Sequence, residues 1–174
     1  MCCDGKAMRV FVKSFGCSTN LADGQVLAGC LSKARFEIAR SASTADVVVC
    51  NTCAVKEPTE NRIIDILKKI PSDKKLVVVG CLPLINFDRL SKEVRFDAAA
   101  GPALGSRIVE LVERVLSNEK VVWLQNADDS LPMLGLPRIR QNRVISIIPI
   151  SYGCLGSCAY CCVTHARGRL RSYG

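Results

Sequence analysis

The chain has 174 residues, and 24 Lys and Arg against 16 Asp and Glu give it a formal net charge of +8. Its 49% hydrophobic content excludes a disordered chain, and no apolar run approaches the roughly 18 residues that a membrane span needs. The first residues contain no apolar stretch typical of a secretion signal, so we expect a cytoplasmic protein.

Short apolar strands alternate with helices along the first 125 residues. Strands are predicted at 8–15, 45–50, 75–80, 94–99 and 121–124. Helices are predicted at 20–33, 57–70 and 106–116, the last with Ser106 as a candidate N-cap. This order predicts an α/β fold, an open parallel sheet with helices on both faces.

Residues 126–137 are rich in polar residues, proline and glycine, and a new strand is predicted at 144–151. We therefore divide the chain into a domain at 1–125, a linker at 126–143 and the start of a second domain at 144–174. The last part is too short to bury a core of its own. We expect the chain to be cut short within that second domain.

Cysteine and arginine are unevenly used. In a chain without an export signal, metal or cluster ligation explains 11 cysteines better than disulfides do. Residues 138–174 contain six arginines and no Lys, Asp or Glu, whereas the 137 residues before them carry a net +2. Such a segment suits phosphate recognition, but a solvated tail or an interface with acidic protein would look the same.

Three cysteines follow three successive predicted strands: Cys17, Cys53 and Cys81. The carboxyl ends of parallel strands share one edge of the sheet, where open α/β sheets build their sites. Gly16 and Gly80 permit sharp turns before two of these thiols. We expect a shared metal site, although each cysteine could instead be a small buried apolar residue.

A second set has the spacing Cys-x₃-Cys-x₂-Cys: Cys154, Cys158 and Cys161. Three thiolates can hold three irons of a 4Fe–4S cluster and leave the fourth iron open for a substrate or cofactor. Zinc is the alternative, with Cys162 or His165 as its fourth ligand.

This second loop, with Tyr160 before its last cysteine, resembles the radical S-adenosylmethionine (radical SAM) superfamily. The longer string from 153 to 173 is similar to that of the methylthiotransferases, which also carry three separated cysteines in motifs like Gly16-Cys17, Asn51-Thr-Cys53 and Gly80-Cys81. The approach at 137–142, followed by Ile-Ser-Ile-Ile, most resembles the archaeal and eukaryotic branch that modifies N6-threonylcarbamoyladenosine in tRNA.

The resemblance implies two 4Fe–4S clusters and S-adenosylmethionine as cofactors. Cys154, Cys158 and Cys161 would bind the radical SAM cluster, with Tyr160 near the adenine of S-adenosylmethionine. A 5′-deoxyadenosyl radical would then take hydrogen from C2 of the modified adenosine at position 37. Cys17, Cys53 and Cys81 would bind an auxiliary cluster that carries or donates sulfur, which a second S-adenosylmethionine methylates.

The family also implies partners: a tRNA substrate, an electron donor such as a reductase, flavodoxin or ferredoxin, and a sulfur donor. Family members continue into a full radical SAM barrel and an RNA-binding TRAM domain, so we expect no turnover from this chain alone. Two other interpretations stay open. One is the relative that modifies a ribosomal protein, and the other is a non-enzymatic iron–sulfur or zinc module.

The remaining cysteines and the histidine depart from these sets. Cys162 stands where the family usually has another residue, and we interpret it as a bystander or an oxidation liability. Cys50 and Cys30 are predicted to be core residues, and His165 to be a packing or substrate-side residue. Cys2 and Cys3 receive no role.

Overall fold

The structure is a computed structural model that describes residues 7–54, 57–125, 134–142 and 144–172. Its main element is a parallel sheet of six strands in the order β2-β1-β3-β4-β5-β6. The strands are β1 (Arg9–Ser14), β2 (Glu37–Ile38), β3 (Val47–Thr52), β4 (Lys75–Gly80), β5 (Ala98–Ala100) and β6 (Val121–Trp123).

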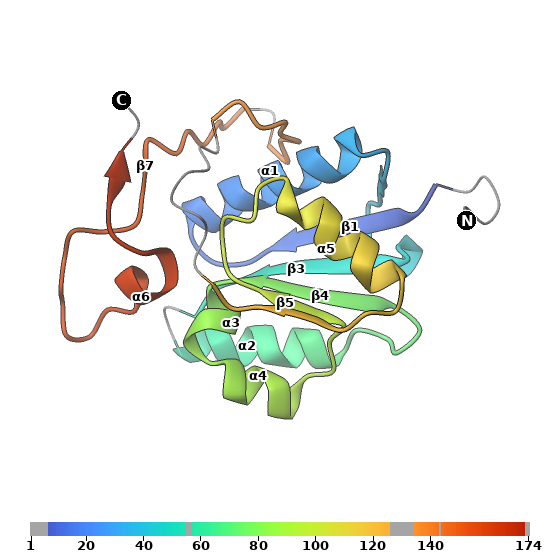
Figure 1. Ribbon diagram of the computed structural model, residues 1–174, viewed down its shortest axis with the longest axis horizontal. Coiled ribbons are helices and arrows are strands. Elements are labelled where there is room, and N and C mark those ends of the chain that lie inside the picture. The colour runs from blue at the N-terminus through green and yellow to red at the C-terminus, as the bar shows by residue number, and fades with distance from the viewer. Residues whose placement is uncertain (1–6, 55–56, 126–133, 143, 173–174) are drawn as a thin grey trace.

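Helices cover both faces of this sheet (Figure 1). One face carries α1 (Ser18–Lys33) and α5 (Arg107–Leu116). The other carries α2 (Glu57–Lys68), α3 (Cys81–Ile85) and α4 (Phe87–Glu93), and a short 3₁₀ turn spans Ala42–Thr44. The predicted α/β fold with a parallel sheet is confirmed.

The two faces have separate apolar cores, because successive side chains of a strand point to opposite sides. Val47 and Val49 of β3 join the core beneath α1 and α5. Val48 and Cys50 join the core beneath α2 and α4. A strand buried on both faces must be apolar throughout, which explains the continuous run of valines in the sequence.

Some predicted elements differ from the structure. The strand predicted at 94–99 pairs only at Ala98–Ala100, and β2, α3 and α4 were not predicted. Ser106 does precede α5, but its backbone is already helical and its hydroxyl makes no capping hydrogen bond. A cap requires an extended backbone at that residue, so the prediction of Ser106 as a cap is wrong.

Beyond residue 143, β7 (Ser151–Tyr152) pairs antiparallel with β8 (Arg171–Ser172), and α6 (Val163–Arg167) lies between them. The strand predicted at 144–151 is wrong for residues 144–150, which pair with no strand in the described part of the chain. Val144 there is 92% exposed. Strand β8 offers only a two-residue ladder, so pairing begins at Ser151.

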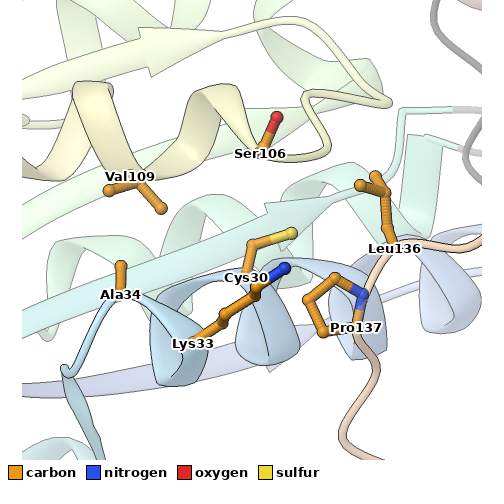
Figure 2. A pocket seen from close by; sticks show the side chains of 7 residues that line it. All are labelled: Cys30, Lys33, Ala34, Ser106, Val109, Leu136 and Pro137. Carbon is orange, nitrogen blue, oxygen red and sulfur yellow. The ribbon is translucent and has the colours of Figure 1, made fainter.

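Residues 134–142 cross the outer side of α1. The Ile139 amide donates to the Gln25 carbonyl at 2.9 Å. Figure 2 shows Leu136 and Pro137 beside Cys30 of α1, with Val109 of α5 opposite; together they line a cavity of about 350 Å³. No helix in the described ranges is long and apolar enough to cross a membrane.

Leu111 tests the core beneath α5. Its side chain is fully buried, so Leu111→Ala should lower the free energy of unfolding by about 2–5 kcal/mol. Glu113→Ala, on the exposed side of the same helix, should change it by less than about 0.5 kcal/mol. Urea unfolding measures both, and equal losses would contradict this core.

Candidate metal centre

Three strands end together at one edge of the sheet. Parallel pairing sets Ser14 opposite Asn51, and Thr52 opposite Gly80. The candidate cysteines follow directly: Cys17 precedes α1 with an extended backbone, Cys53 comes after β3, and Cys81 begins α3. The structure therefore brings the three sequence-distant cysteines to one edge.

Asn20, on the first turn of α1, holds the strand ends at this edge. Its Nδ2 donates to the Phe15 carbonyl at 2.9 Å and to the Thr52 carbonyl at 2.8 Å. The Asn51 side chain donates in return to the Asn20 carbonyl at 2.7 Å. Asn20 is fully buried, so these bonds satisfy backbone groups that water cannot reach.

Cys53 and Cys81 are buried, whereas Cys17 is exposed. Burial raises the pKa of the Cys81 thiol to about 11, Arg167 of α6 opposes this rise, and nearby Cys53 and Cys17 add to it. Cys17 and Cys81 line one cavity of about 130 Å³ together with Arg167. Two of the three thiols, those of Cys17 and Cys81, thus share one small cavity with the Arg167 guanidinium.

The turn before Cys17 is shaped to fit against Cys53. Gly16 has φ of +98°, and a Cβ built there would collide with the Cys53 Cβ and lie 2.8 Å from its Sγ. Three soft sulfur donors suit an iron–sulfur or zinc centre. In the part of the chain that the structure describes, no three His, Cys, Asp or Glu side chains are already close enough to share one metal ion.

Cys154, Cys158 and Cys161 lie on the loop between β7 and α6. The Gly156 amide donates to Cys154 Sγ at 3.3 Å, and a Cβ at Gly156 would lie 3.4 Å from that sulfur and 3.8 Å from Cys158 Sγ. The Cys161 amide donates to the Cys158 carbonyl at 3.1 Å. The loop thus curls two thiols around Gly156, while Cys158 and Cys161 stay exposed.

Cys162 reaches the other cysteine set. Its Sγ lies 3.9 Å from the Ala54 carbonyl, next to Cys53 in the chain. Burial raises the pKa of the Cys162 thiol, and Cys161 and Cys53 both add to that rise. The loop is therefore docked beside the sheet edge, with Cys162 between the two candidate sites.

Sequence reasoning missed the residues that dock this loop. Arg167 Nη2 donates to Asp23 Oδ2 at 2.9 Å and to Asn20 Oδ1 at 2.5 Å. The hydroxyl of Tyr152 donates to the other oxygen of Asp23. Asp23 is the one acidic residue of α1 and is buried there, and an acid among the mainly apolar residues of a helix is the one signal that could have revealed it.

Of the remaining cysteines, two lie in the core as predicted and two lie outside the residues that the structure describes. Cys50 and Cys30 are buried core residues, and burial raises the pKa of Cys50 to about 12. His165 is exposed on α6, and Tyr160 is 92% exposed. Cys2 and Cys3 lie outside the described residues.

A basic groove of about 600 Å³ lies near β2, between β1 and the segment that crosses α1. Lys13, Arg40 and Arg140 line it, all exposed, and none of its lining residues is acidic. Arg138 is tied instead to the Ile147 carbonyl at 3.3 Å. Arginine and lysine in such a groove suit an anionic ligand such as a phosphate backbone.

Comparison with known proteins adds a family and relatives. Residues 9–101 match the model of the uncharacterized protein family UPF0004. Over 95% of its length the chain is 37% identical to a probable threonylcarbamoyladenosine tRNA methylthiotransferase of Pyrococcus abyssi, and 36% identical to the threonylcarbamoyladenosine tRNA methylthiotransferase of Homo sapiens. It spans 39% and 29% of the lengths of these two relatives.

Gly16 tests the packing of the first turn against Cys53. Gly16→Ala should destabilise the fold by more than the roughly 1–3 kcal/mol of backbone strain, because its Cβ also displaces Cys53. Gly135→Ala is the matched control: its φ is +82°, but nothing lies within 4 Å of the added Cβ. Urea unfolding should separate the two variants, and equal losses would mean that the contact with Cys53 does not constrain the turn.

Proposed function

Because the chain belongs to the uncharacterized protein family UPF0004, and its relatives are named tRNA methylthiotransferases, we propose that it carries the two cysteine sites of such an enzyme. The reaction is insertion of a methylthio group at C2 of N6-threonylcarbamoyladenosine, at position 37 beside the anticodon. The observation that carries the proposal is the docking of the second cysteine loop against the sheet edge that bears the first set.

Each cysteine set has its own role in this proposal. Cys17, Cys53 and Cys81 hold an auxiliary 4Fe–4S cluster, and Cys154, Cys158 and Cys161 hold the radical SAM cluster. Held by three protein thiolates, the second cluster would keep one iron open to bind S-adenosylmethionine, and in its reduced state it would supply the electron for cleavage of that cofactor. The division into residues 1–125, 126–143 and 144–174 is part of the same proposal.

The solvent exposure of the cysteine side chains supports these two separate roles. The second set must admit S-adenosylmethionine, and Cys158 and Cys161 are exposed. Tyr160 leaves its ring free to stack on the adenine of S-adenosylmethionine, being 92% exposed. Cys53 and Cys81 are buried, which suits a group that must be shielded from water until it gives up sulfur. An external electron donor and a sulfur source complete the reaction.

Cys162 favours one rival interpretation. Because it lies between the two sets, it could provide the fourth thiolate of a zinc site or of a fully ligated electron-transfer cluster. Cys162→Ala separates the two interpretations: it should abolish metal binding at a four-thiolate site and leave a three-thiolate cluster intact.

Metal content tests the two sites directly. After anaerobic reconstitution we expect about eight irons per chain, falling to about four in Cys154→Ala and in Cys53→Ala. Cys30→Ala is the matched control, because Cys30 is another buried cysteine but lies in the core beneath α1 and α5. It should leave the iron content unchanged.

Two outcomes of that assay would contradict the proposal. Loss of all iron in both ligand variants would contradict two separate sites. Stoichiometric zinc with little iron would favour the structural module.

The basic groove tests the substrate class. Arg40→Gln and Arg140→Gln should each weaken tRNA binding and reduce the slope of log affinity against log salt by about 1 for every phosphate that the variant no longer binds. Lys92→Gln, an exposed cation on α4, should change neither quantity. Filter binding over a salt series measures both. A strong, salt-dependent affinity for tRNA would count against the relative that modifies a ribosomal protein, and its absence would contradict the tRNA substrate.

A further inference from the structure

A buried polar cluster joins the cysteine loop to α1. Arg167 and Tyr152 come from the loop segment, and Asp23 and Asn20 come from α1. The side chains of Arg167 and Asp23 are only 7% and 2% exposed. The Nη2 end of the guanidinium is fully occupied by Asp23 and Asn20.

The other terminal nitrogen of the same guanidinium, Nη1, is not occupied within the described part of the chain. Nη1 of Arg167 is buried and has no hydrogen-bond partner among the residues that the structure describes. Arg167 lines the cavity that also contains Cys17 and Cys81. A buried charged donor without an acceptor costs free energy, so its presence beside a cavity points to an acceptor that binds there.

Charge identifies the kind of acceptor. A guanidinium stays protonated in proteins, so the buried Arg167 side chain carries a positive charge. Asp23 pairs with Nη2 of the guanidinium, and Nη1, which has no partner among the described residues, keeps its donors for an anion. Thiolate-bound sulfur clusters are anionic, and hydrogen bonds to their sulfurs help set their reduction potential.

We propose that Arg167 binds the anionic sulfur of the group held by Cys17, Cys53 and Cys81, through Nη1, while Nη2 docks the cysteine loop on α1. This inference rests on the proposed function, because it requires a sulfur cluster at those cysteines. Arg167 is then a positioning residue with two roles. Its Nη2 holds the loop on α1, and its Nη1 stabilises the reduced, more negative state of the cluster.

The experiment isolates the auxiliary site by using the chain with Cys154, Cys158 and Cys161 all changed to Ala. The reconstituted protein is titrated with reductant and followed by electron paramagnetic resonance. Arg167→Gln should move the midpoint potential to a more negative value, because it removes a positive charge and its donors. Arg167→Lys, which keeps the charge, should give an intermediate value. Arg169→Gln, an exposed arginine two residues away, should match the parent.

Asp23→Asn separates binding from docking, because it removes the charge of the docking partner while the chain keeps the Arg167 guanidinium. If Arg167→Gln loses iron while Asp23→Asn retains it, Arg167 acts on the cluster and the proposal stands. If both lose iron equally, Arg167 acts only by docking and the proposal fails. It fails also if Arg167→Gln keeps its iron at an unchanged potential. A parent that takes up no iron would refute the proposed function instead.

Discussion

The parallel register of β1, β3 and β4 is the constraint on which the candidate sites depend. It places Ser14 beside Asn51 and Thr52 beside Gly80, so that the three strands stop together and the next residues of each must turn away. The strand ends leave backbone groups that α1 satisfies through Asn20, at 2.8 Å from the Thr52 carbonyl. The cysteines that follow these strands lie at one edge because the register aligns the strand ends, and no local sequence motif is needed to bring them together.

A second constraint is the buried pair between Arg167 and Asp23. Taking two charges out of water is costly, and a buried pair is tolerated when further hydrogen bonds surround it, as Tyr152 and Asn20 do here. Such a pair is worth little as a source of stability, yet it defines one position of the loop segment against α1. Within the described residues the segment is held beside the sheet by this pair together with the packing of α6 against α3 and of Tyr152 in the core.

The sequence predicted whatever depends on local periodicity and missed whatever depends on distant partners. Strands β3 and β4, which precede Cys53 and Cys81, contain continuous apolar runs, and helix α5 has a clear apolar face, so their positions were predictable. Strand β2 has only two residues, and it is a strand because it pairs with the edge of β1. Arg167 lies 144 positions from Asp23, so it looked like one of several arginines in a basic segment. The apolar residues after 143 suggested a strand, but pairing needs a neighbour, and there they have none among the described residues.

The two cysteine sets differ in how they meet solvent, and this difference follows from where the chain places them. In the first set, Cys53 after β3 and Cys81 at the start of α3 are buried, whereas Cys17 before α1 is exposed. The second set lies on a loop outside those layers, and Cys158 and Cys161 are exposed. Helix α6 packs against α3 and carries Arg167 inward, while Cys162 at its start lies near Cys53. The second loop is therefore open to solvent at Cys158 and Cys161, while its end at Cys162 lies against Ala54, the residue after the buried Cys53.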